Sequence, residues 1–260
     1  MYTLTIPIMN RVVKKELRED YLSELKRAGA SRIFIAIDKH FAFDEERRKE
    51  YAILQENIAY FESQGFEVGV WIPALGYGEA SNYKNKELAK YYTKITSLTG
   101  RTLDDAECVT DENYVCLMAA NVLDIARCGA KMIMLDDDFC LSVRPGIGCA
   151  CDNHMKLFCD QVGEQVDRTA LKSKLFCGGK NKYRSAWMKV MGDSLLHFAY
   201  KIREALDSEY PDVRLGYCAG FTSWDLEGID AISLCPGIRR HYEALSKIDG
   251  RTLLGFFQAF

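Results

Sequence analysis

Three consecutive aspartates, Asp136, Asp137 and Asp138, follow the apolar run Met-Ile-Met-Leu. Adjacent residues of a strand point to opposite faces, so Asp136 and Asp138 are expected on one side and Asp137 on the other. Neighbouring carboxylates repel one another and resist being buried together. A solvated turn or a helix cap would tolerate them. A catalytic rim or a bound metal explains better why an apolar strand runs directly into three acidic residues.

A second group of reactive side chains follows shortly after, where Cys149, Cys151 and His154 fall within six residues. Thiolate and imidazole are typical zinc ligands, and a structural zinc site needs four of them. The candidates for the fourth position are Cys108, which is favoured, and Cys140 or Cys159 as alternatives. A chain with ten cysteines can also produce such spacings by chance, since buried cysteine packs as a small apolar residue. We expect a structural zinc site.

An alternation of strands and helices must position these groups. Strands are expected at 3–9, 31–38, 66–73, 131–136, 213–220 and 229–237, and 251–260 can form a seventh. Helices are expected at 14–30, 44–65 and 113–130, after Asn153, and at 185–209, with a long insertion at 76–112. Continuous apolar strands separated by helices predict a parallel sheet that is buried on both faces.

The length of the chain suits one α/β barrel, so the pattern predicts a single TIM-barrel-like catalytic domain, (β/α)8, over residues 1–260. Six or seven of the eight strands are found, so we expect the barrel to be incomplete at its C-terminus. Exposed strand edges can pair between copies, which makes a homo-oligomer a further expectation. The alternative is a doubly wound open sheet, although no dinucleotide-binding fingerprint is present.

In a parallel barrel, the loops that follow the strands build the active site. Besides the three aspartates, these positions hold six candidate substrate-binding residues, namely Arg11, Asp38, Trp71, Tyr77, Trp224 and Asp225. Carboxylates can transfer protons, and flat rings can cover the apolar faces of sugars, which is the chemistry of a carbohydrate site. Each residue alone is a weak signal, and Trp71 is equally compatible with a place in the core.

The composition argues against several other classes of protein. The net charge of −3 gives no electrostatic reason to bind nucleic acid, which needs a basic face. No apolar run approaches the ~20 residues of a membrane-spanning helix, and the start of the chain lacks the features of a signal peptide. We therefore expect a cytoplasmic protein whose ten cysteines are reduced or bound to metal.

The segments around the aspartates and cysteines resemble the family 42 glycoside hydrolases, which are retaining β-galactosidases with a TIM-barrel catalytic domain. "MLDDDF" stands where that family has an Asn-Glu motif after strand four, and "CACDNHMKLF" where it has a cysteine-rich stretch. "ECVTDENY" stands where an upstream cysteine completes the family's zinc site. The resemblance implies a zinc site made of Cys108, Cys149, Cys151 and His154, with the histidine in place of a cysteine.

The resemblance also implies catalytic roles. Asp138 takes the acid/base position, where it would protonate the glycosidic oxygen and then activate water, helped by a pKa that Asp136 and Asp137 raise. Gln258, in "LLGFFQ", falls at the nucleophile position, where a glutamine cannot attack. In an alternative mechanism, an aspartate after strand four is the nucleophile and the acid lies elsewhere, for example at Asp225.

The leading hypothesis is a glycoside hydrolase that acts on the O-glycosidic bond of a carbohydrate substrate with aspartates after strand four. The second is a metal-dependent hydrolase or lyase that binds its ion through Asp136–Asp138. Against it, the chain has four histidines, of which only His40 follows a strand. The third is a non-catalytic sugar-binding barrel, which would explain the glutamine at the nucleophile position.

Overall fold

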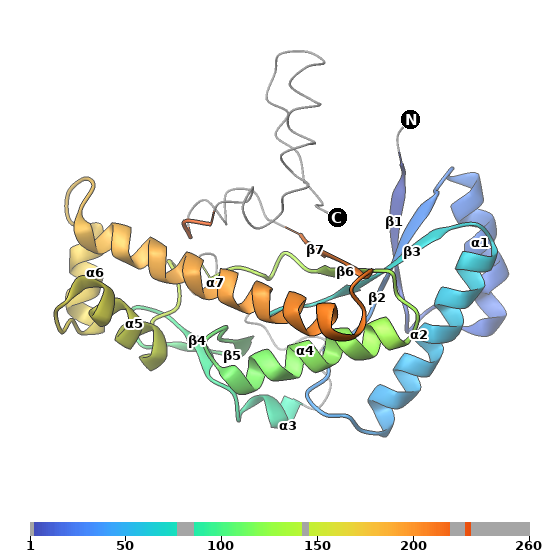
Figure 1. Ribbon diagram of the computed structural model, residues 1–260. Helices are drawn as coiled ribbons and strands as arrows, with labels where there is room; N and C mark the ends of the chain where they lie inside the picture. The colour runs from blue at the N-terminus through green and yellow to red at the C-terminus, as the bar shows by residue number, and fades with distance from the viewer. Residues whose placement is uncertain (1–2, 77–85, 142–145, 219–226, 230–260) are drawn as a thin grey trace, which may run out of the picture.

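The computed structural model describes residues 3–76, 86–141, 146–218 and 227–229, and Figure 1 shows their arrangement. The main sheet consists of β1 (Thr5–Met9), β2 (Arg32–Ala36), β3 (Glu67–Ile72), β6 (Met132–Leu135) and β7 (Arg214–Tyr217). All neighbouring pairs are parallel, and the spatial order β1-β2-β3-β6-β7 follows the order of the chain. A doubly wound sheet reverses its strand order at one point. The described strands show no such reversal.

The two faces of this sheet have different neighbours. Ile33, Val70 and Ile133 belong to the large core that also contains the apolar faces of the helices. The alternate residues Phe34 and Met134 belong to a separate cluster on the opposite face. Because side chains alternate along a strand, the sheet has one helix-covered face and one face that lacks helices among the described residues. This is the arrangement found on one side of a β/α barrel.

The helices connect successive strands. Their bounds are η1 (Lys15–Leu17), α1 (Arg18–Arg27), α2 (Glu45–Ser63), α4 (Glu112–Arg127), α5 (Asp152–Val162), α6 (Arg168–Phe176) and α7 (Lys182–Glu209). The side chains of Asp44, Asp111, Asp167 and Asn181 accept hydrogen bonds from backbone N–H groups in the first turns of α2, α4, α6 and α7. Such caps satisfy donors that have no partner inside the helix, so they fix where each helix begins.

The predicted insertion forms a small separate layer. It contains α3 (Lys86–Ala89) and an antiparallel hairpin of β4 (Lys94–Thr96) and β5 (Thr102–Glu107). The hairpin ends directly before Cys108, so it carries one of the predicted metal ligands.

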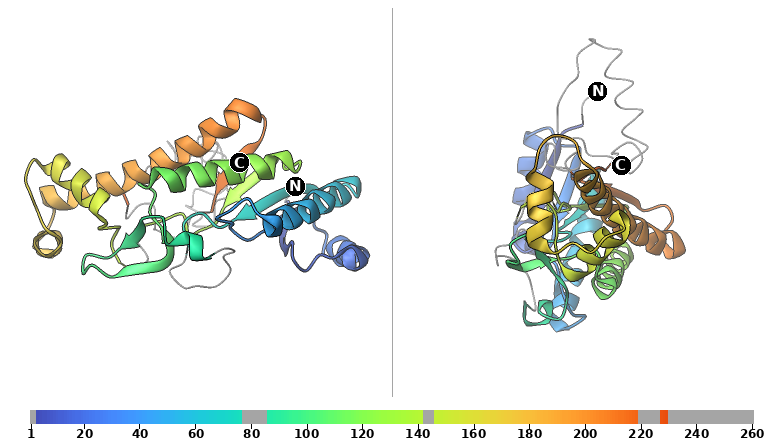
Figure 2. Two further views of the ribbon diagram at one scale, coloured as in Figure 1. Left: turned by 90° about the horizontal axis from the view of Figure 1, so that it is seen from below. Right: turned by 90° about the vertical axis from the view of Figure 1, so that its left-hand side faces the viewer.

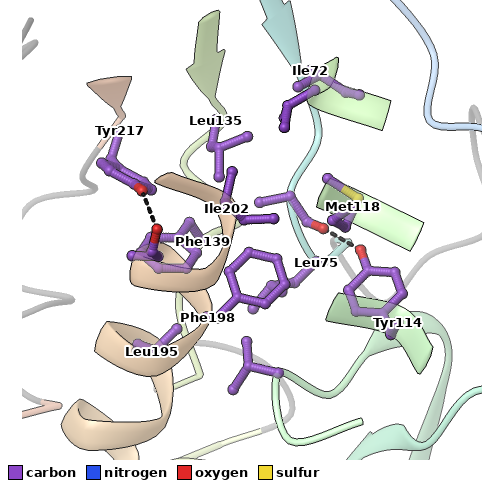
Figure 3. Packing of buried hydrophobic residues seen from close by; sticks show 14 of the residues in the cluster. Ile72, Leu75, Tyr114, Met118, Leu135, Phe139, Leu195, Phe198, Ile202 and Tyr217 are labelled. Carbon is purple, nitrogen blue, oxygen red and sulfur yellow. Dashed lines mark hydrogen bonds between the residues drawn. The ribbon is translucent and has the colours of Figure 1, made fainter. Parts of the chain in front are cut away.

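The core lies between the sheet and helices α4 and α7, which run side by side (Figure 2). Figure 3 shows this packing, with contributions from Ile72, Leu135, Met118, Phe139, Phe198 and Ile202. On the other face, Gly69 of β3 lies against Phe34, and a Cβ atom at position 69 would stand 2.4 Å from a carbon of its ring. The Phe34 ring therefore covers position 69, where it leaves no room for a Cβ atom.

The strand and helix pattern predicted from the sequence is confirmed in its main part, with two differences. Helix α6 was not predicted. Strand β6 ends at Leu135. The alternation of side chains between the two faces of a strand, which was expected to extend through all three aspartates, therefore stops before Asp137. The strands expected at 229–237 and 251–260 lie outside the described residues, apart from residue 229 itself. Within the described part of the chain, no helix combines the length and apolar character needed to span a bilayer.

Candidate active site and metal centre

The carboxyl ends of the parallel strands bring several predicted residues to one edge of the sheet. Trp71 pairs with Met134 on β6, and the backbone N–H of Asp136 donates to the carbonyl of Ile72 at 3.0 Å. The ladder therefore continues as far as Asp136. By alternation, Asp136 lies on the same face as Met134 and Trp71, away from the helices. Cys218, one residue beyond β7, belongs to the same face.

Arg11 and Asp38 follow the first two strands and lie close to each other. Arg11 Nη1 is 3.9 Å from Asp38 Oδ1. The arginine side chain is 52% exposed, whereas that of the aspartate is 6% exposed. The pair therefore has one buried partner and one that can reach a ligand at the strand ends. Both were predicted as substrate-binding residues, and this role stays a prediction.

Trp71 is half-buried at the end of β3, and its indole nitrogen is fully buried. Within the described residues, this nitrogen has no hydrogen-bond partner. A buried donor without a partner costs free energy, so such a group gains from a ligand oxygen that reaches it. Trp71 therefore combines a partly exposed ring with a buried N–H group that has no partner among the described residues.

The three aspartates have different environments. Asp136 and Asp137 are half-buried, and the backbone N–H of Asp137 donates to Asp136 Oδ1 at 2.7 Å. Asp138 is only 3% exposed, and its carboxylate accepts the backbone N–H groups of Ala74, Leu75 and Gly76 at 2.7, 3.1 and 2.6 Å. The three side chains therefore have distinct environments, which their adjacency in sequence does not reveal.

Burial raises the pKa of Asp138 to about 7. The positive charge of Lys39 and the N–H groups of Ala74 and Gly76 oppose this rise, and the negative charge of Asp136 adds to it. The sequence predicted a raised pKa from the neighbouring carboxylates. The larger cause is the loss of water around the group.

A buried ion pair joins the sheet edge to the insertion. Lys39 and Glu107 are both fully buried, and Lys39 Nζ donates to Glu107 Oε2 at 2.7 Å, to the Leu75 carbonyl at 2.9 Å and to the Tyr114 hydroxyl at 2.9 Å. Burial lowers the pKa of Lys39, and the charges of Glu107 and Asp138 act against that shift. Lys94 donates to the second Glu107 oxygen at 2.7 Å. Sequence reasoning gave no role to Lys39 or Glu107, because lysine is almost always exposed.

The predicted cysteine and histidine ligands come together beside the hairpin of the insertion, where Cys149 Sγ accepts from the Thr96 N–H. Cys108 follows β5, Cys149 and Cys151 precede α5, and His154 lies in the first turn of α5. All four are buried, and their ligand atoms lie within 4.8 Å of one another. Cys108 Sγ is 3.7 Å from Cys149 Sγ, 3.6 Å from Cys151 Sγ and 3.3 Å from His154 Nδ1, and Cys151 Sγ is 3.4 Å from the same nitrogen. This cluster can hold a metal ion.

The electrostatics of the cluster also suit a cation. Burial raises the pKa of Cys108 well above its usual value and that of Cys149 to about 12, while hydrogen bonds from the neighbouring thiols lower the pKa of Cys151. Without a cation, three buried thiolates cannot coexist, because each destabilises the others. His154 Nε2 is buried and has no partner within the described residues, which leaves Nδ1 as the atom that faces the sulfurs.

The structure thus brings together Cys108, Cys149, Cys151 and His154, and it excludes the alternative fourth ligands from the group. Cys159 instead exchanges contacts with the backbone of Val166 at 3.3 and 3.5 Å. The predicted residues Tyr77, Trp224, Asp225 and Gln258 lie outside the described residues. Sequence reasoning did not identify Cys218 as part of the strand-end face.

A β-galactosidase from the psychrophilic Marinomonas ef1 shares this fold, with a TM-score of 0.58 and 11% identity over 82% of this chain. The chain spans about a third of the length of that protein, which is 36% covered. Two structures of a Flavobacterium johnsoniae GH31 dextranase align over 80% and 87% of this chain and 24% and 26% of theirs, each at 10% identity. Their TM-scores of 0.39 and 0.42 are too low to support an argument. No protein-family model and no curated protein matches the sequence.

Proposed function

We propose that the chain forms the catalytic barrel of a glycoside hydrolase that cleaves an O-glycosidic bond. The observation that carries this proposal is the edge of the sheet where Asp38, Trp71 and Asp136 end or follow three neighbouring parallel strands, with Trp71 on the face opposite the helices. Carboxylates beside an aromatic platform can exchange protons with a glycosidic oxygen while the ring covers the sugar.

The fold supports the same proposal. The sequential parallel order and the single helix-covered face are those of a β/α barrel, and the β-galactosidase from Marinomonas ef1 has the same fold. We propose that the chain is a divergent relative of the family 42 barrels whose motifs it resembles.

Among the three aspartates, Asp136 suits a direct role best, because it continues the face of β6 that Trp71 shares. Arg11 would bind sugar hydroxyls, with the buried Asp38 beside its guanidinium, and Asp137 would contribute negative charge beside Asp136. The second catalytic carboxylate is proposed to be Asp225, which follows the fifth main-sheet strand.

We further propose that the cysteine cluster holds a structural zinc ion. A tetrahedral zinc site with Zn–S bonds of ~2.3 Å and a Zn–N bond of ~2.0 Å separates two sulfurs by ~3.8 Å and a sulfur from a nitrogen by ~3.5 Å. The observed separations of 3.6 and 3.7 Å between sulfurs, and of 3.3 and 3.4 Å from sulfur to nitrogen, fit this geometry. Four protein ligands leave no open position, so this ion would stabilise the fold and take no part in the reaction.

The alternative of a catalytic metal on the three aspartates gains no support from the described residues. Among the described residues, the group of side chains whose ligand atoms lie close enough together to hold a metal ion is the cysteine cluster. Asp138 is occupied by backbone N–H groups, and His40 is buried with its Nε2 paired to Glu50.

The hydrolase proposal is tested with purified protein and a panel of 4-nitrophenyl α- and β-glycosides. We expect release of nitrophenol from at least one glycoside, and a loss of about 10²- to 10⁴-fold in kcat for Asp136→Asn, the range for removing a proton-transfer group. Asp193→Asn, at an exposed position of α7, is the matched control. Binding of sugar without turnover would favour the non-catalytic barrel. Turnover that requires an added divalent ion would favour the metal-dependent enzyme.

The zinc proposal is tested by elemental analysis. We expect about one zinc per chain in the wild type and a loss of zinc in Cys149→Ser. Cys159→Ser is the matched control, because Cys159 is also a buried cysteine, within α5, but lies outside the cluster. Absence of zinc from the wild type, or equal zinc in both variants, would refute the assignment.

A further inference from the structure

We infer that Asp138 is a positioning residue, which fixes the backbone after β3 beside the proposed active site through three N–H bonds to its buried carboxylate. This inference rests on the proposed glycoside hydrolase activity. It differs from the role that the family resemblance implies, in which Asp138 exchanges a proton with the substrate.

The contacts of Asp138 are those of a structural group. Oδ1 accepts the N–H of Ala74 at 2.7 Å, and Oδ2 accepts those of Leu75 at 3.1 Å and Gly76 at 2.6 Å. Three consecutive backbone donors thus converge on one carboxylate. Both oxygens are engaged, and the residue is only 3% exposed. A group that exchanges protons with a sugar must reach within hydrogen-bond distance of the glycosidic oxygen. The oxygens of Asp138 face the protein backbone instead.

The carbonyl groups of the same segment are held from its other side. The Leu75 carbonyl accepts from Lys39 Nζ at 2.9 Å and from the Glu107 backbone N–H at 3.1 Å. The Tyr114 hydroxyl donates to the Ala74 carbonyl, as Figure 3 shows from the side of the core. The donors and the acceptors of this short segment therefore have partners on different elements. Its conformation is determined by tertiary contacts, since it belongs to no helix or strand.

The segment links two neighbouring strand ends. It begins two residues after Ile72, whose carbonyl accepts from the backbone N–H of Asp136. The side chain of Asp138, which follows β6, accepts hydrogen bonds from the backbone of the segment that follows β3. The relative position of Trp71 on β3 and Asp136 after β6 is therefore set partly by Asp138. Misplacement of reacting groups by ~1 Å can cost about 10²-fold in rate.

The test compares the wild type with Asp138→Asn on aryl glycosides whose phenol leaving groups span a range of pKa values. The amide keeps the size of the side chain, but it replaces one oxygen acceptor with a donor that opposes backbone N–H groups. We expect kcat/KM to fall about 10- to 100-fold and by the same factor for every leaving group. We also expect sodium azide to restore no activity, because no proton-transfer group has been removed. Lys189→Met, on the exposed face of α7, is the control for unrelated substitutions.

A loss that grows with the pKa of the leaving phenol, or rescue of Asp138→Asn by azide, would overturn the inference and make Asp138 the acid/base catalyst. A wild type that hydrolyses no glycoside would instead refute the proposed function. Hydrogen exchange of the wild type tests the positioning role independently of the proposed activity, and it does not require the variant to fold. The amides of Ala74, Leu75 and Gly76 should exchange at least 100-fold more slowly than in an unstructured peptide. Unprotected amides at these positions would refute the positioning role directly.

Discussion

Replacing Lys39 with methionine should destabilise the protein strongly, because it leaves a buried negative charge without its main partner. The ammonium of Lys39 and the carboxylate of Glu107 are both fully buried at a separation of 2.7 Å. The substitution also removes the donor to the Leu75 carbonyl and to the Tyr114 hydroxyl. Removing one partner of a buried ion pair costs about 3–5 kcal/mol. That is a large part of the 5–15 kcal/mol that stabilises a typical domain.

The assay is equilibrium unfolding in urea, followed by far-ultraviolet circular dichroism, for wild type, Lys39→Met, Glu107→Leu and the double variant. The double variant should lose less than the sum of the single variants, because neither charge is then left alone. Lys189→Met is the matched control. Its partner Asp193 lies at 2.6 Å, but the two side chains are 55% and 59% exposed. An exposed pair of this kind on a helix contributes about 0.5 kcal/mol or less.

Two results would refute this reasoning. A cost for Lys39→Met no larger than that of the control would mean that water reaches the pair. Strict additivity of the two single variants would mean that Lys39 and Glu107 do not interact, and that Lys94 alone compensates the carboxylate.

Three other perturbations have expected outcomes of their own. Chelation should lower the thermal midpoint of the wild type but leave that of Cys149→Ser unchanged, because binding of a metal by the folded state alone adds to its stability; an equal shift in both proteins would contradict a metal at the cluster. The pKa of about 7 for Asp138 lies above the usual 3.8, so protonation stabilises the fold, and this stability is lost as the pH rises. Relative to Asp138→Asn, the free energy of unfolding of the wild type should fall by about 3 kcal/mol between about pH 4 and pH 7, and urea titrations with parallel pH profiles would refute the shift. Gly69→Ala should lower the free energy of unfolding by about 1–3 kcal/mol in the same titration, because the new methyl would stand 2.4 Å from a carbon of the Phe34 ring on β2. Gly146→Ala is the control and should be near neutral, because its methyl would have no atom within 4 Å. Equal losses in the two variants would show that the Phe34 ring moves away freely.

The parts of the fold that were predictable are those with a local signal. Helix α2 has an acidic first turn, apolar residues at helical spacing and a glycine at its end, and its bounds of Glu45–Ser63 lie close to the predicted 44–65. The cysteine cluster was predictable because three of its ligands lie within six residues. Helix α6 was missed, although Asp167 is a typical capping residue and accepts from the Ala170 N–H.

The parts that were not predictable depend on contacts between distant segments. Nothing near Lys39 in the sequence indicates its burial, because its partner Glu107 is 68 residues away. The role of Asp138 was hidden in the same way, since its three donors come from residues 62 to 64 positions earlier. Adjacent aspartates look equivalent in a sequence. They become different when the strand ends at Leu135 and the chain turns.

Helix α7 has a consequence for how the molecule unfolds. Its 28 residues make it about 42 Å long, and it packs against α4 as well as against α5 and α6. Helix α7 therefore contacts both α4, which covers the sheet, and the helices α5 and α6 on the side of the cysteine cluster. The two regions should lose structure in a single cooperative event, because neither can open without exposing part of the same helix. In native-state hydrogen exchange, the central amides of α7 should exchange only through global unfolding, so their free energy of opening should equal that of the whole domain.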